Sequence, residues 1–183
     1  MSYETALKKA WDDLVFLKAP NHLSVKFMAD EYSLDFAARQ VLSLSCNGPA
    51  KDLLSILVLH YLVQKLKGLP GLSGQWITFR ELSGIQGYYD AYHKRSIEPV
   101  IRKYGQDPDA IKNVLSRLPA KLSEGGDVSI VVEAFTEVPV LIKLWKADSE
   151  FGPDANLYYD ASIKNIFCIE DIVVLAQLVV GQL

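Results

Sequence analysis

The 183-residue sequence has few of the features that assign a chain to a specialised class of protein. Its two cysteines, Cys46 and Cys168, are too few for a disulfide framework or a four-thiolate metal site. Its 19 basic and 22 acidic residues give a net charge of -3, so there is no excess of positive charge to bind a nucleic-acid backbone or an anionic membrane surface. We therefore expect neither nucleic acid nor a membrane as a partner.

Long apolar runs are also missing. The most apolar segment, residues 53–63, carries His60 and is shorter than the roughly 20 residues that cross a bilayer. The chain opens with Met1-Ser2-Tyr3-Glu4 rather than with the basic and then apolar start of a secretory signal. These features predict a cytoplasmic protein whose thiols stay reduced.

What the sequence does contain is typical of a globular chain. Half of its residues are hydrophobic and 22% are charged, which excludes intrinsic disorder and a fibrous chain. The length suits one domain of ordinary size, and no linker or internal repeat divides it, so we expect a single domain over residues 1–183.

Hydrophobic periodicity predicts an α+β fold. Apolar residues at helical spacing predict five helices, over residues 3–18, 50–67, 88–104 with a break at Pro99, 107–118 and 172–180. Alternating residues predict a short meander over 23–44, a strand at 76–79, a long hairpin over 128–144 and a strand at 156–160. The strands come in clusters without regular β-α-β alternation. We therefore expect an antiparallel sheet, made of the short meander plus the long hairpin, packed with about five helices.

The common motifs of catalysis and cofactor binding do not occur. The sequence has neither phosphate-binding glycine motif, no His-Glu-x-x-His helix and no Gly-x-Ser-x-Gly elbow. We predict no metal site and no evident cofactor. His60 is expected to be a core histidine bonded to a carbonyl. Cys168 is expected to be a small buried residue or a poor helix cap.

Two groups of residues are candidates for a site. The first is acidic and late in the sequence, and aromatic residues such as Trp145 are interleaved with it. Its carboxylates could bind a hard cation or act as acid and base, or could simply cap helices and close turns. The residues of this group are Asp148, Glu150, Asp154, Asp160, Glu170 and Asp171.

The second group is central and contains an arginine among aromatic residues, a combination that can bind an anionic ligand. A packed edge of the core accounts for it equally well. It comprises Trp76, Phe79, Arg80, Glu81, Tyr88 and Tyr89. We predict that the two groups fold back to line one hollow. The ligand-binding candidates are then Trp76, Arg80, Trp145, Asp148, Glu150 and Asp160.

The late and central segments together resemble a prokaryotic family known only as domain of unknown function 3786. The resemblance is carried by residues 144–151 (Leu-Trp-Lys-Ala-Asp-Ser-Glu-Phe), residues 156–162 (Asn-Leu-Tyr-Tyr-Asp-Ala-Ser) and the pair Glu170-Asp171. Residues 73–82 (Ser-Gly-Gln-Trp-Ile-Thr-Phe-Arg-Glu-Leu) are similar to the middle segment of that family.

The resemblance implies a context rather than an activity. Some members of the family look joined to iron–sulfur modules or occur near corrinoid and anaerobic one-carbon proteins. This sequence lacks a cysteine-rich extension, has Ser149 where an acidic residue is common and has Tyr159 where Phe is common. These departures weaken the prediction of a cluster of its own and of a metal site.

Three hypotheses for the function follow. The first is a non-catalytic accessory domain of anaerobic prokaryotic metabolism that binds a small ligand or a protein partner. The second is a hydrolase in which Asp148, Glu150 and Asp160 hold Mg²⁺ or act as acid and base. The third is a self-associating structural protein that could form a homodimer. Its apolar final helix would then contribute both to the core and to the dimer interface.

Overall fold

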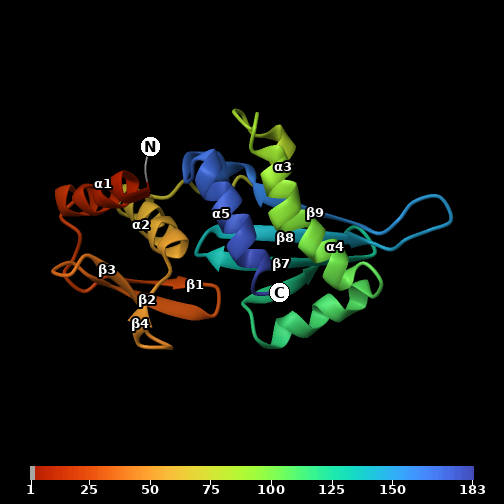
Figure 1. Ribbon diagram of the computed structural model, residues 1–183, viewed down its shortest axis with the longest axis horizontal. Coiled ribbons are helices and arrows are strands. Elements are labelled where there is room, and N and C mark those ends of the chain that lie inside the picture. Colours follow the sequence, from red (N-terminus) through yellow and green to blue (C-terminus); the bar gives the residue numbers. More distant parts are fainter. Residues whose placement is uncertain (1–2) are drawn as a thin grey trace.

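The computed structural model describes residues 3–183, and its amino-terminal part is a helix followed by a small sheet (Figure 1). Helix α1 (Tyr3–Phe16) precedes four antiparallel strands paired in sequence order, β1-β2-β3-β4. The predicted meander is confirmed. Its strands are β1 (Ser24–Phe27), β2 (Asp30–Asp35), β3 (Gln40–Ser43) and β4 (Gly48–Pro49).

The second sheet is larger and has the strand order β5-β9-β8-β7-β6, with every neighbouring pair antiparallel. The predicted hairpin forms its centre, as β7 (Val128–Phe135) and β8 (Val138–Trp145). The other strands are β5 (Trp76–Thr78), β6 (Ala120–Ser123) and β9 (Asp154–Asp160). The meander and the hairpin thus belong to two sheets, not to one.

Strand β6 was not predicted, because its apolar and polar residues (Ala-Lys-Leu-Ser) alternate over only four positions, the shortest run that can indicate a strand. None of its four residues is buried, and Leu122 is 56% exposed at the edge of the sheet. The two sheets meet through backbone and aromatic contacts. The N–H of Met28 donates to the carbonyl of Ala134 over 2.8 Å, and the rings of Phe27 and Phe135 lie 4.9 Å apart.

Helices cover one face of the five-stranded sheet (Figure 1). Helices α2 (Asp52–Lys67) and α5 (Ile169–Val180) contact each other, and most of their apolar residues are buried. The apolar residues that made α5 a candidate dimer seam therefore belong mainly to the core. The covered face of β9 contributes Ala155, Leu157 and Tyr159, all nearly inaccessible to solvent.

The segment predicted as one broken helix over 88–104 has three parts. Helix α3 (Tyr89–Tyr92) passes into a π-helical turn, η2 (His93–Ile97), and then into α4 (Glu98–Tyr104). Pro99 lies in the first turn of α4, as the predicted break requires. Proline has no N–H and its ring clashes with the carbonyl four residues earlier, here that of Arg95. The wider π turn contains Arg95, which relieves this constraint.

Short 3₁₀ segments complete the chain. They are η1 (Phe79–Glu81), η3 (Pro108–Ser116) and η4 (Ala161–Asn165). The segment predicted as a helix over 107–118 is thus 3₁₀, not α-helical, over most of its length. Within residues 3–183, no helix is both long enough and apolar enough to span a membrane.

The burial of β9 gives a direct test of the fold. Leu157→Ala should lower the free energy of unfolding by about 2–5 kcal/mol, because the side chain is 0% exposed. Leu122→Ala removes the same atoms from an exposed edge and should cost less than about 0.5 kcal/mol. Urea unfolding followed by tryptophan fluorescence measures both variants. Equal losses would contradict a central position of β9.

Candidate functional site

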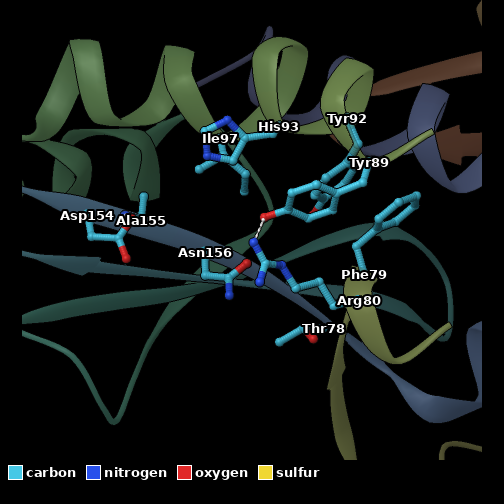
Figure 2. A pocket seen from close by; sticks show the side chains of 10 residues that line it. All are labelled: Thr78, Phe79, Arg80, Tyr89, Tyr92, His93, Ile97, Asp154, Ala155 and Asn156. Atoms are coloured by element: carbon cyan, nitrogen blue, oxygen red, sulfur yellow. Dashed lines mark hydrogen bonds between the residues drawn. The ribbon is translucent and has the colours of Figure 1, made fainter. Parts of the chain in front are cut away.

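A cavity of about 400 Å³ lies between the α3–η2 segment and the strand edge formed by β5 and β9 (Figure 2). One wall is polar and comes from β9 and η1, and the other carries aromatic and apolar side chains. The lining residues are Thr78, Phe79, Arg80, Tyr89, Tyr92, His93, Ile97, Asp154, Ala155 and Asn156.

The cavity exists because β5 is shorter than β9. Strand β5 ends at Thr78, opposite Tyr158, so residues 154–157 of β9 have no strand beside them on this side. The N–H groups of Ala155 and Leu157 donate instead to the side-chain oxygens of Asp154 and Asn156, over 2.8 and 2.9 Å. These backbone N–H groups on the edge of β9 are therefore satisfied by side chains of the same strand, and the edge is left open to solvent.

Glu81 ends β5 by turning the chain into η1. Its carboxylate accepts hydrogen bonds from the N–H and the hydroxyl of Thr78, over 2.7 and 2.8 Å. Both bonds lower the pKa of Glu81, and the first of them forms a capping box together with the Glu81 N–H, which donates to the side chain of Thr78. Because the carboxylate of Glu81 is engaged with Thr78, it does not neutralise the neighbouring Arg80.

Arg80 is the cationic group of the cavity. Its Nη2 donates to the hydroxyl of Tyr89 over 2.6 Å, and its guanidinium carbon lies 4.4 Å from the centre of the same ring. Within residues 3–183, no carboxylate lies within ion-pair distance of Arg80. Tyr89 therefore orients the guanidinium while most of its donors remain available to a ligand.

Two buried aromatic residues support this wall. The rings of Phe79 and Tyr92 stack with their centres 4.0 Å apart, and the hydroxyls of Tyr92 and Tyr159 are 3.1 Å apart. Burial raises the pKa of both tyrosines, so their hydroxyls remain neutral. The back of the cavity is thus rigid and uncharged.

The π turn aligns three residues with the cavity. Tyr89, His93 and Ile97 follow one another at intervals of four, and all three line it. The rings of Tyr89 and His93 are 6.0 Å apart, and Nδ1 of His93 lies 3.4 Å from a carboxylate oxygen of Glu98. The wider turn keeps these side chains on one line toward β9.

The six predicted site residues do not share this cavity; only Arg80 lines it. Trp76 and Asp160 are cross-strand partners at one end of β9, while Trp145 pairs with Asp154 at the other end. Six residues of strand separate these ends by about 20 Å. Asp148 and Glu150 lie in the loop beyond Trp145, which extends away from the sheet (Figure 1).

Asp148, Glu150 and Asp160 consequently do not meet, which removes the geometry that a hydrolase built on them requires. Within residues 3–183, no group of three His, Cys, Asp or Glu side chains is arranged to hold a metal ion. Asp148 instead closes a turn by accepting the N–H groups of Glu150 and Phe151, over 2.8 and 2.7 Å. These bonds lower the pKa of Asp148.

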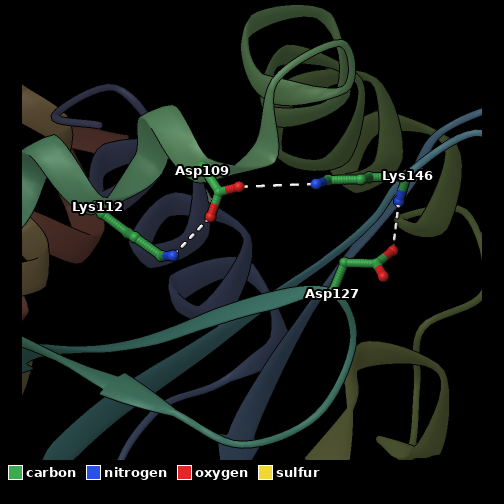
Figure 3. A network of polar contacts seen from close by, with 4 residues as sticks. All are labelled: Asp109, Lys112, Asp127 and Lys146. Carbon is green, nitrogen blue, oxygen red and sulfur yellow. Dashed lines mark hydrogen bonds and ion pairs between the residues drawn. The ribbon is translucent and has the colours of Figure 1, made fainter.

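A polar network fixes the start of that loop (Figure 3). Asp109 pairs with Lys112 over 2.5 Å and with Lys146 over 3.6 Å, and the N–H of Lys146 donates to Asp127 over 2.7 Å. All four residues are exposed, so the network contributes little stability. It directs the loop toward η3 and the turn before β7.

Asp160 is a structural residue. Its side chain accepts the N–H groups of Ser73, Gly74 and Ser162, over 2.8–2.9 Å, and the hydroxyl of Ser73 over 2.9 Å. Burial acts to raise the pKa of Asp160, but the hydrogen bonds from Ser162 and Ser73 hold it well below its usual range. The carboxylate thus joins the 73–74 loop to the start of η4.

His60 differs from its predicted surroundings, whereas Cys168 is a poor helix cap, one of the two roles predicted for it. His60 is half-buried, and its Nδ1 lies 2.8 Å from a carboxylate oxygen of Asp171 on α5, not against a carbonyl. Cys168 is the exposed N-cap of α5 and lines a second cavity of about 630 Å³. Desolvation raises the pKa of the Cys168 thiol to about 12. The charge of Asp171 acts in the same direction and a hydrogen bond from its backbone N–H opposes it, so the thiolate is disfavoured at neutral pH.

The sequence analysis did not include His93 or Asn156 among the candidate site residues. It grouped Asp154 with the late acidic residues rather than with Arg80, whose cavity it lines. One signal was present. Asp154 and Asn156 alternate with the apolar residues Ala155 and Leu157, which puts both polar side chains on one face of a strand. The position of His93 depends on the π turn, and no local pattern marks that turn.

The four hydrogen bonds of Asp160 make stability depend on pH. Because the pKa is lower in the folded than in the unfolded chain, the carboxylate contributes stability that is complete above about pH 4 and is lost at lower pH. Asp160→Asn should lower the free energy of unfolding by about 1–3 kcal/mol at neutral pH. The deficit should shrink in acid. Urea unfolding at several pH values measures it.

Glu150→Gln is the matched control, because Glu150 is exposed and lies in the same part of the sequence. It should leave stability unchanged at every pH. A deficit of Asp160→Asn that stays constant as the pH falls would show that the charge of Asp160 does not stabilise the fold.

Comparison with known proteins gives a family but no activity. Searches among curated proteins and among solved structures find no match. One family model, described as Domain of unknown function (DUF3786), matches residues 12–182, nearly the whole chain. The resemblance seen in the central and late segments is thus confirmed. The chain belongs to the family Domain of unknown function (DUF3786).

Proposed function

We propose that this chain is a non-catalytic binding domain whose cavity takes a small organic carboxylate. The observation that carries the proposal is the state of Arg80. Tyr89 holds its guanidinium in place, yet no carboxylate of residues 3–183 pairs with it. A guanidinium that is oriented and unpaired matches the two oxygens of a carboxylate.

The other charges of the cavity favour a singly charged ligand. Asp154 lines the same space, and Glu98 lies beside His93. A phosphate or dicarboxylate would bring two negative charges close to these side chains, and like charges at short range repel. A monocarboxylate places its one charge at Arg80 and avoids this cost.

The remaining lining suits an aliphatic or aromatic body. Phe79, Tyr92, Ile97 and Ala155 are buried residues whose side chains reach the cavity. Small-molecule sites combine such apolar contacts with oriented polar groups, and here polar groups provide most of the exposed lining. We assign binding rather than catalysis because arginine keeps its proton at neutral pH and cannot act as an acid or base.

The family resemblance suggests an accessory domain of anaerobic prokaryotic metabolism, in an iron–sulfur or corrinoid context. Its two cysteines would then be reduced thiols in the cytoplasm, and a protein partner or a second copy would bind elsewhere on the surface. These assignments are part of the proposal.

Titration with pentanoate tests the site. The unchanged protein should bind pentanoate with a dissociation constant of about 1 mM, which corresponds to about 0.6 kcal/mol per non-hydrogen atom and lies within the range of roughly 0.3–1.5 kcal/mol that small ligands reach. Arg80→Gln should weaken binding about 10-fold or more, because it removes a charge-assisted hydrogen bond. Amide chemical shifts recorded by NMR during the titration give the affinity and the residues affected.

Arg95→Gln is the control, because Arg95 is exposed on the π turn but does not line the cavity. It should bind pentanoate like the unchanged protein. Equal affinities of Arg80→Gln and the unchanged protein, or no shift changes at all near the cavity, would refute the proposed function.

A further inference from the structure

We propose that the cavity selects ligands that carry an amine several carbons away from the carboxylate, with Asp154 binding the ammonium group. This inference rests on the proposed function, in which Arg80 binds the carboxylate. It adds a second charged anchor and thereby defines the ligand class as ω-amino carboxylates.

Asp154 has a free oxygen in the cavity. Its Oδ1 accepts the N–H of Ala155 over 2.8 Å, which fixes the carboxylate at the edge of β9. Within residues 3–183, no lysine, arginine or histidine lies within ion-pair distance of Asp154. The second oxygen is therefore available as an acceptor.

Arg80 and Asp154 are two opposite charges that line one cavity without pairing with each other. Figure 2 shows Asn156 between them, with the guanidinium turned toward Tyr89 and Asp154 at the far end. A ligand with one charge of each sign would satisfy both groups at once. A ligand with a single charge satisfies only one of them.

The register of β9 sets the distance that the ligand must span. Asp154 and Asn156 are two residues apart on the same face of the strand, which separates their side chains by about 7 Å. Arg80 lies beyond Asn156, after the end of β5. An α-amino acid carries its ammonium and carboxylate on one carbon and cannot reach both anchors. A chain of several methylene groups can, and it would lie along Ile97 and Ala155.

Asn156 fits this arrangement as a neutral group between the anchors. Its side-chain oxygen accepts the N–H of Leu157 over 2.9 Å, and its amide also bonds to the side chain of Tyr158, so neighbouring residues of β9 hold Asn156 in place. Because Asn156 is uncharged, it forms no ion pair with Arg80 or with Asp154, and both anchors stay available to a ligand.

A series of matched five-carbon compounds tests the inference by the same NMR titration. The series is pentanoate, 5-aminopentanoate, glutarate and pentylamine, which differ only in their terminal groups. The unchanged protein should bind 5-aminopentanoate about 10-fold more tightly than pentanoate, and glutarate more weakly than pentanoate. Pentylamine should bind weakly because it lacks the group for Arg80.

Asp154→Asn is the decisive variant, because its amide oxygen can still accept the N–H of Ala155 while the charge is lost. This variant should bind 5-aminopentanoate no more tightly than pentanoate and should improve the binding of glutarate. Asp148→Asn is the control, since Asp148 is an exposed loop residue that does not line the cavity. It should leave the order of affinities unchanged.

The two proposals fail in different ways. Equal binding of pentanoate and 5-aminopentanoate by the unchanged protein, with both lost in Arg80→Gln, would overturn the role of Asp154 and leave the carboxylate site intact. A preference for the amine that survives Asp154→Asn would also overturn it. If every compound binds the Arg80→Gln variant as tightly as it binds the unchanged protein, the proposed function is refuted, and the inference with it.

Discussion

Strand β9 pairs unequally with its two neighbouring strands, and this determines where the core and the cavity lie. The strand pairs with β8 from Asp154 to Tyr159 but with β5 only over its last three residues. Its fully paired part carries Tyr159, which is buried under the helices, and its half-paired part carries Asp154 and Asn156. One strand therefore supplies both the centre of the core and the open edge where the cavity forms.

The chemistry of the two ends of β9 follows from that difference. At the paired end, Asp160 is buried and both of its carboxylate oxygens accept hydrogen bonds from backbone N–H groups. At the open end, Asp154 has one bonded oxygen and one free oxygen. Two aspartates on one strand thus have different roles, and the number of surrounding donors distinguishes them.

Much of the fold could be predicted from local patterns, because period-two and helical spacings record which side chains are buried. The β7–β8 hairpin and α2 are examples. The division into two sheets could not be predicted, because the same alternation suits a strand of either sheet. How the two sheets meet depends on contacts between residues far apart in the sequence, such as that of Phe27 with Phe135. The edge strand β6 leaves no such record, because none of its four residues is buried.

Of the six ligand-binding candidates only Arg80 lines the cavity, although Phe79, Tyr89 and Asp154 were members of the two candidate groups. An arginine among aromatic residues is a chemical signal that survives in the sequence, whereas the relation of Arg80 to Asp154 depends on where β5 stops. The pairing of Trp76 with Asp160 shows that the central and late segments do come together, as predicted. They do so, however, at the end of β9 away from Trp145, Asp148 and Glu150, because a strand of seven residues lies between.

The side-chain bonds along the open edge of β9 also affect how copies of this chain behave at high concentration. A bare strand edge presents unpaired N–H groups that can recruit a strand from a neighbouring molecule and start aggregation. Here Asp154 and Asn156 already occupy the N–H groups of Ala155 and Leu157. The edge stays accessible to small solutes while being a poor template for intermolecular β-pairing.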